Sequence, residues 1–173
     1  MLFRSIMSLY VTHDQEEAMS VSDRLAVFNH GRLMQLGVPA EIFETPISLF
    51  VADFLGKANF LTAPSVRRDA SGAGVTLDGG HSLAVPRVVT LPADEAERIP
   101  AECEGLVMVR PSRVRIDPRS GFISARVVRI QYLGGLARYA LTGEGAPAEL
   151  TVDAQRPQPG VTEIGRASCR ERV

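Results

Sequence analysis

His13 is the residue of this sequence best placed to do chemistry on a phosphate. It follows a short apolar run at residues 8–11, which predicts a buried strand, and it precedes a helix start that either Thr12 or Asp14 can cap. In an α/β fold, a side chain at the carboxyl end of a strand and beside a helix start can reach a bound phosphate. Because a neutral imidazole both donates and accepts hydrogen bonds, His13 could contact such a phosphate. The simpler alternative is a histidine that only ends a strand.

The sequence does not contain the other parts needed for phosphoryl transfer. Lys57 is the only lysine; Ala58 follows it and Val51 stands where a glycine is needed, so it does not belong to a Gly-x-x-x-x-Gly-Lys-Ser/Thr phosphate loop. We therefore expect this chain alone neither to bind ATP tightly nor to hydrolyse it. His30 and His81 lie far apart in the sequence and have no cysteine partner, so no metal site is expected.

Two groups of charged residues have structural explanations that we favour over chemical ones. Acidic residues at positions 14, 16 and 17 can stabilise the first turn of a helix through its dipole, although paired carboxylates can also serve as an acid and a base. Arginines gather in one stretch of the second half: Arg110, Arg113, Arg115 and Arg119. They form either a solvated face, which we favour, or an anion-binding regulatory patch.

Composition excludes several functional classes. Of the 173 residues 45% are hydrophobic, and 19 Lys and Arg against 20 Asp and Glu give a net charge of −1. This balance, without a basic run, argues against a domain that mainly binds nucleic acid. A disulfide framework is not expected. Of the two cysteines, Cys169 lies in the carboxyl-terminal segment 163–173, whose origin is considered below, and without it Cys103 has no cysteine to pair with. With no long apolar stretch and no leader-like segment, a cytoplasmic location is expected.

Both ends of the chain read like translated sequencing adapter. Residues 1–5 and 163–167 can be encoded by DNA stretches that are reverse complements of each other, and the adapter can continue through residue 173. The alternative is an unusual basic tail. We therefore divide the chain into residues 1–5 and 163–173 as adapter-derived, and residues 6–56 and 57–162 as two domains that meet at a change in composition.

The first predicted domain combines a strand, helices and a hairpin. Residues 25–28 and 33–36 predict the hairpin strands, and the turn lies at residues 29–31, where Asn and Gly accept positive φ. Pro39 predicts a helix start, and Gly56 lies just past a helix end. The side chains expected to be buried are Ala18, Met19, Val21, Phe43, Phe50, Phe54 and Leu55.

The second predicted domain consists of short strands and is expected to form a small barrel. Four segments are rich in β-branched or apolar residues: 107–110, 123–132, 136–141 and 149–152. Within the long segment, Val128, Ile130 and Tyr132 are expected to share one face, and Gly134-Gly135 supplies a kink at a barrel corner. Residues 71–80 predict a loose hairpin, and residues 92–100 a helical or mobile insertion.

Several blocks of sequence occur in an order and spacing that one protein family shares. They are residues 10–18, 22–24, 37–43, 49–56 and 59–61. In this order they resemble the switch-histidine region and the end of the ATPase domain of ABC importer ATP-binding subunits, of the polyamine and ferric-iron type. Residues 107–111 and 132–135, with Tyr139, resemble the TOBE domain that is appended to these subunits. Ser112 departs from the family pattern, in which an acidic residue usually follows Arg-Pro.

The resemblance implies a fold class and an activity. The fold would be the α/β end of an ABC ATPase domain followed by an all-β, OB-like TOBE barrel, which stops before its final strand and leaves a sheet edge open. The chain would be a carboxyl-terminal fragment of the enzyme that couples ATP binding and hydrolysis to import, of polyamine first, or of ferric iron or phosphonate. His13 would face the γ-phosphate of ATP and the attacking water, and the full-length protein would use ATP and Mg²⁺.

The resemblance also implies partners and a location. The partners would be the transmembrane permease subunits and a second ATPase subunit, with a substrate-binding protein engaged indirectly and no nucleic acid. The full complex would sit peripherally on the inner face of the cell membrane. The alternative function is a stand-alone OB-like module that binds a small anion or sugar without ATPase activity.

Overall fold

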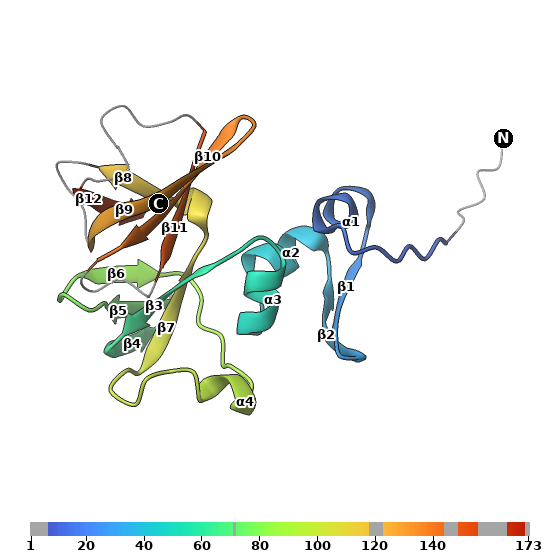
Figure 1. Ribbon diagram of the computed structural model, residues 1–173. Coiled ribbons are helices and arrows are strands. Elements are labelled where there is room, and N and C mark those ends of the chain that lie inside the picture. Colours follow the sequence, from blue (N-terminus) through green and yellow to red (C-terminus); the bar gives the residue numbers. More distant parts are fainter. Residues whose placement is uncertain (1–6, 71, 118–122, 144–148, 156–165, 172–173) are drawn as a thin grey trace. The chain divides into compact units, whose positions relative to one another are not determined.

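The chain forms two compact units, Met1–Pro46 and Ile47–Val173, which are described separately here. The computed structural model describes residues 7–70, 72–117, 123–143, 149–155 and 166–171 (Figure 1). The first unit mixes helices with a hairpin, whereas the second consists mainly of strands in small sheets. The predicted change from an α/β part to an all-β part is confirmed. The join predicted between residues 56 and 57, however, lies inside the second unit.

The first unit is built around a β-hairpin. Its elements are α1 (Gln15–Val21), β1 (Leu25–Asn29), β2 (Arg32–Gly37) and α2 (Pro39–Glu44). The hairpin and its turn are confirmed: Asn29 pairs with Arg32, and the two turn residues His30 and Gly31 have φ of 46° and 75°. Two consecutive positive φ values are typical of the tight turn whose twist matches that of the two strands. The left-handed conformation expected of Asn29 is taken by His30, because Asn29 is still paired in β1.

The strand predicted at residues 8–11 is not formed, so this prediction is wrong. The segment is extended but unpaired, and Leu9 and Val11 are 94% and 87% exposed. A strand needs a neighbour for its backbone N–H and C=O groups, and no described residue supplies one. Val21 is likewise 66% exposed although it was expected to be buried, and α1 contains no buried residue. The apolar residues of this part are thus not covered within the described structure.

Two short helices lie between the predicted proline start and glycine end. Pro39 occupies the first turn of α2, as predicted, and α3 (Leu49–Phe54) begins the second unit. Gly56, just past α3, has φ of 127°, which confirms the predicted helix end. Among the side chains expected in the core, Leu55 is buried, whereas Phe43 and Phe50 are half-buried and Phe54 is 39% exposed and stacks on Phe50.

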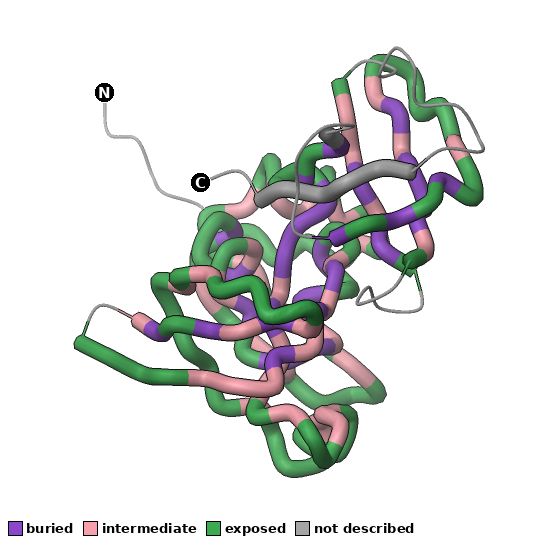
Figure 2. Tube along the Cα trace, turned by 90° about the vertical axis from the view of Figure 1, so that its left-hand side faces the viewer, coloured by how far each residue is buried: buried purple, intermediate pink, exposed green. Residues whose placement is uncertain are grey.

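The second unit contains three antiparallel sheets. Its remaining elements are β3 (Asn59–Ala63), β4 (Ser65–Asp69), β5 (Gly72–Thr76), β6 (Ser82–Val85), α4 (Ala93–Ala96), β7 (Gly105–Val109), η1 (Pro111–Arg113), β8 (Val114–Asp117), β9 (Ile123–Leu133), β10 (Leu136–Thr142), β11 (Leu150–Ala154) and β12 (Arg166–Glu171). The strands β3 and β7 pair, β4, β5 and β6 form a meander, and the third sheet has the order β11-β10-β9-β12-β8. Buried positions recur along these strands (Figure 2). They form one hydrophobic core, whose largest fully buried side chain is Tyr139.

The four strands predicted in this part are confirmed, but the predicted shared face of β9 is wrong. Ala125 and Val127 point into the core, and Ile130 packs against it as well. In the pairing of β9 with β10, Ala140 lies opposite Arg129 and Leu141 lies opposite Val127. Val128 therefore has no partner on β10, and this extra residue is exposed. This β-bulge moves the inward face from odd to even positions, which separates Val128 from Ile130.

Three further predictions concern turns and insertions. Gly134-Gly135 is the two-residue turn of the β9–β10 hairpin, with φ of 66° at Gly134, and not a kink inside a strand at a barrel corner. Residues 92–100 contain the helix α4, which confirms the helical form of that insertion. In the segment at 71–80, β5 pairs antiparallel with β6 across a turn that contains Gly79 and Gly80, so the predicted hairpin is confirmed, although its second strand lies beyond residue 80.

Strand β12 lies between β8 and β9 and pairs with both of them. The open sheet edge predicted for a barrel lacking its final strand is therefore wrong at this position. Strand pairing uses backbone groups that every residue except proline carries, so a short tail can complete a sheet whatever its side chains are. The prediction that residues 163–173 are adapter-derived is a statement about the coding DNA and stays a prediction.

Asn59 joins two sheets through its side chain. Its Nδ2 donates to the Thr151 carbonyl oxygen (2.7 Å), and its Oδ1 accepts from the Thr151 backbone N–H (2.8 Å). Asn59 lies on β3, is 3% exposed, and thereby fastens that strand to β11 of the five-stranded sheet. One carboxamide reproduces the pair of bonds that a neighbouring strand would make.

We expect Asn59→Ala to lower the free energy of unfolding by about 2 kcal/mol, because it leaves the partly buried N–H and C=O of Thr151 without their partners. Urea unfolding followed by circular dichroism measures this loss. Asn29→Ala, the same substitution at the end of β1, should change the stability of the second unit by less than about 0.5 kcal/mol. Equal effects of the two variants would contradict the bridging role of Asn59.

Candidate functional site

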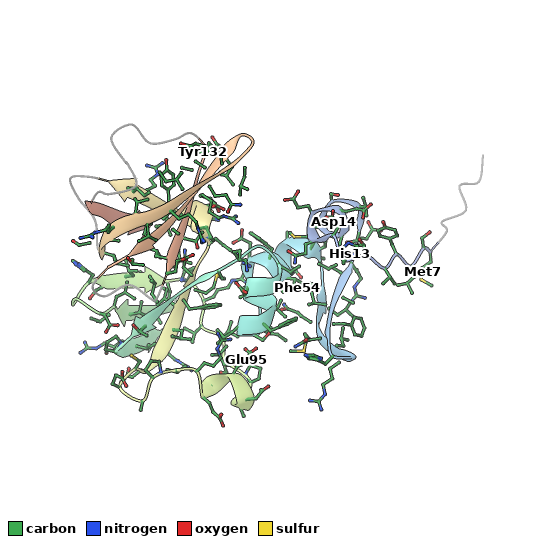
Figure 3. The ribbon with its side chains drawn as sticks, viewed as in Figure 1. Met7, His13, Asp14, Phe54, Glu95 and Tyr132 are labelled. Atoms are coloured by element: carbon green, nitrogen blue, oxygen red, sulfur yellow. The ribbon has the colours of Figure 1, made fainter. Side chains whose placement is uncertain are left out.

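His13 lies in the turn immediately before α1, and its side chain is exposed (Figure 3). Two hydrogen bonds fix this turn on either side of it. The Asp14 backbone N–H donates to Thr12 Oγ1 (3.0 Å), and the Glu17 N–H donates to Asp14 Oδ1 (2.9 Å). Asp14 is therefore the N-cap of α1, which confirms one of the two caps predicted from the sequence. The backbone that carries the imidazole is fixed, while the ring itself is accessible to a ligand.

Glu17 reinforces the same turn from the helix side. Its Oε2 accepts hydrogen bonds from the Tyr10 hydroxyl (2.9 Å) and from Thr12 Oγ1 (3.3 Å). The bond to Glu17 raises the pKa of Tyr10, because the carboxylate stabilises the protonated phenol. Since Asp14 and Glu17 both serve the turn and the helix start, the structure supports the structural explanation of these carboxylates.

The other two histidines lie in other elements than His13. His30 occupies the turn between β1 and β2, and His81 lies in the second unit between β5 and β6; both are exposed. No three His, Cys, Asp or Glu side chains among the described residues come together in a way that would hold a metal ion. Cys103 is a free, half-buried thiol, and burial raises its pKa, as do the nearby carboxylates of Asp78 and Glu102.

Arg110 differs from the other arginines of the predicted group that the structure describes, because it is buried. Arg110 is 5% exposed, and its Nη1 donates to the carbonyl oxygens of Ala52 (2.5 Å) and Lys57 (2.9 Å). Arg113 and Arg115 are exposed, and Arg119 lies outside the described residues. Arg110 thus belongs neither to a solvated face nor to an anion-binding patch, because it binds backbone carbonyls at the carboxyl end of α3.

Glu95 binds the opposite end of the same helix. Its Oε2 accepts from the Leu49 N–H (2.5 Å) and its Oε1 from the Phe50 N–H (3.1 Å) (Figure 3). An anion at the amino end and a cation at the carboxyl end both match the dipole of α3. These two contacts explain why α3 belongs to the second unit, although its sequence resembles the end of the preceding domain.

Sequence reasoning missed these structural partners, since each acts over a long separation in the chain. Glu95 lies 46 residues after Leu49, and Arg110 lies 58 residues after Ala52. One signal was available: Arg110 directly ends the apolar run of β7, where a charge is unexpected. Arg138 and Asp153 form an ion pair across β10 and β11 (2.7 Å), and the hydrogen bond to Asp153 raises the pKa of Arg138.

Comparison with known proteins identifies one domain family. The description "TOBE domain" matches residues 107–165, a region that includes the end of β7 and the strands β8 to β11. This agrees with the domain expected from residues 107–111, residues 132–135 and Tyr139. In the described residues no helix is long and apolar enough to cross a bilayer.

Curated relatives match most of this chain. The sulfate/thiosulfate import ATP-binding protein CysA 1 of Chromobacterium violaceum is 40% identical over 153 residues, which cover 88% of this chain and 38% of that protein. The spermidine/putrescine import ATP-binding proteins PotA of Mesorhizobium japonicum and Pseudomonas fluorescens are 38% and 36% identical, covering 73% and 79% of this chain and 32% and 36% of those proteins. The chain therefore spans less than two fifths of the length of these relatives.

A search of solved structures finds the cytoplasmic molybdate-binding protein ModG, in a form with molybdate bound. It is 20% identical, with a TM-score of 0.44, and the alignment covers 67% of this chain and 89% of that one.

Proposed function

Because the chain carries a TOBE domain and is related over most of its length to ATP-binding proteins of importers, we propose that it serves in the ATP-binding subunit of an ABC importer. The observation that carries this proposal is the extent of the match: CysA 1 is 40% identical over 153 residues, or 88% of this chain, so the similarity extends beyond the β domain into the first unit. A stand-alone module would explain the β domain but gives no reason for the resemblance around His13.

His13 is the residue of this chain that we propose to act in ATP hydrolysis. Its ring is exposed on a turn held by Asp14 and Glu17, and an imidazole there can accept a hydrogen bond from water or donate one to a phosphate oxygen. The proposed role is to position the attacking water and the terminal phosphate.

ATP and Mg²⁺ are the proposed cofactors of the whole subunit. The described residues fit such a site only in part, because they offer the His13 imidazole but no group of carboxylates that would hold a metal and no lysine loop around a phosphate. We expect the chain by itself not to hydrolyse ATP.

The proposed partners are the permease subunits and a second copy of the ATP-binding subunit, with a cytoplasmic location at the membrane face. The cargo is proposed from the names of relatives, since no described residue indicates it. Polyamine is our first candidate, in line with the spermidine/putrescine importers, with ferric iron or phosphonate as other candidates. The sulfate/thiosulfate relatives add an anionic cargo as a further candidate.

A graft tests the proposal. In CysA 1 of Chromobacterium violaceum, the stretch aligned with this chain is replaced by the residues of this chain, and ATP hydrolysis and sulfate uptake are measured in cells lacking the original protein. We expect the graft to hydrolyse ATP at a rate within about tenfold of the parent, because the exchanged residues are 40% identical. The same graft in a PotA protein reports spermidine uptake.

The graft also distinguishes the alternative, a stand-alone module that binds a small anion or sugar. A graft that is folded by circular dichroism and binds ATP, yet fails to hydrolyse it, would contradict the proposed function. Uptake of one cargo but not the other would not decide the native cargo, because that choice also depends on the permease present in the cell.

A further inference from the structure

We propose that residues 86–104 form a releasable strap, which the carboxylate of Glu95 fastens to the first turn of α3. This inference rests on the second unit alone and is independent of the proposed function. The strap connects β6 to β7, and its one regular element is the short helix α4, which contains no buried residue. Val88 and Val89 on the strap are exposed as well, so little apolar surface holds it down.

Glu95 makes the contact that fastens the middle of the strap. Its two oxygens accept from two different backbone N–H groups, those of Leu49 and Phe50, at 2.5 and 3.1 Å. The first N–H groups of a helix have no partner inside the helix, so they bind a carboxylate well. Both carboxylate oxygens are needed, because each one serves a separate donor.

The far end of the strap is anchored differently. The Glu104 backbone N–H donates to the Ala63 carbonyl (2.9 Å), and Glu104 Oε2 accepts from the Val66 N–H (2.6 Å). These bonds lie next to β7, which pairs with β3 in the core. Loss of the Glu95 contact would therefore release α4 and its flanks while leaving residue 104 in place.

The helix can keep its conformation when the strap leaves. Ser48 Oγ accepts from the Val51 N–H (3.1 Å) at the amino end, and the buried Arg110 holds the carboxyl end. A local opening of this kind costs less than unfolding the unit, because it exposes few buried apolar groups. The Leu49 and Phe50 amides would then be the ones that lose protection.

Residue-resolved amide hydrogen exchange on the full chain, comparing Glu95→Gln with the parent, tests the strap. Glutamine replaces one acceptor oxygen with an NH₂ group that faces an N–H donor, so one of the two bonds cannot form. We expect the Leu49 and Phe50 amides to exchange at least about tenfold faster, while Val51 and the amides of β10 stay unchanged. Trypsin should also cut after Arg98 on the strap faster by a similar factor.

The matched control is Glu97→Gln, which removes the same charge from an exposed residue next to α4. It should leave both amides and the Arg98 cleavage rate unchanged. Unchanged exchange in Glu95→Gln would overturn the proposal, as would an equal effect of Glu97→Gln. Faster exchange throughout the unit, with β10 included, would also overturn it, because Glu95 would then belong to the cooperative core and not to a strap.

Discussion

In the CysA 1 graft, His13→Ala is expected to lower the rate of ATP hydrolysis by at least about 100-fold while leaving ATP affinity within about threefold. The reason is the position of the ring: it is exposed on a turn whose backbone is fixed by Thr12 and Asp14, so it can meet the terminal phosphate and water without ordering the chain first. The alanine variant should keep this turn, since the two hydrogen bonds that hold the turn are made by Thr12, Asp14 and Glu17 and not by His13. Hydrolysis is followed by phosphate release at saturating MgATP, and affinity by equilibrium binding.

His30→Ala in the same graft is the matched control. His30 is also exposed and belongs to the same unit, but it sits in the β1–β2 turn. Its loss should change the hydrolysis rate by less than about twofold. A His13→Ala graft that hydrolyses ATP at the unsubstituted rate would refute the role proposed for this residue, and a loss of ATP binding would show that it holds the nucleotide instead.

Replacing Arg110 with methionine should destabilise the second unit by about 3–5 kcal/mol. Methionine fills a similar volume but leaves the carbonyl oxygens of Ala52 and Lys57 without their charged donor in a buried position. Because small domains are stable by only about 5–15 kcal/mol, this loss should move the urea midpoint strongly or unfold the unit. Arg110→Lys should cost less, since a single ammonium nitrogen can donate both bonds that Nη1 now makes.

Arg115→Met provides the comparison for this variant, because Arg115 is exposed on β8. It should change the free energy of unfolding by no more than about 0.5 kcal/mol. Equal midpoints for Arg110→Met and the parent protein would show that the two carbonyl contacts contribute nothing to stability.

Local sequence signals predicted the elements that form from neighbouring residues. The hairpin at residues 25–36 was predictable from its turn chemistry, and the helix after His13 from the Asp14 cap. The strands of the β domain were predictable from runs of apolar and β-branched residues, and the TOBE match agrees with them. In each of these cases the stabilising partner lies within a few residues, or the pattern repeats along one strand.

Features that depend on distant partners were not predictable. The charge at the end of β7 marks Arg110 as unusual but does not indicate its partners on α3. Nothing near Glu95 indicates that it binds the other end of that helix, and nothing near Asn59 indicates Thr151. The bulge at Val128 reverses a face that strict alternation would keep. The strand predicted at residues 8–11 does not form, although its apolar pattern is typical of a strand. A strand forms only where a neighbouring strand binds its backbone, and the local pattern does not show whether such a neighbour is present.

The Asn59 bridge has a consequence for the behaviour of the protein in solution. In the described sheet, β11 pairs with β10 on one side, and on its other side the Thr151 N–H and C=O are taken by the Asn59 carboxamide. An unoccupied row of such groups would be a template on which a second chain could add and start aggregation. One buried amide therefore blocks the addition of another strand at Thr151, without the lysines or prolines that often do so.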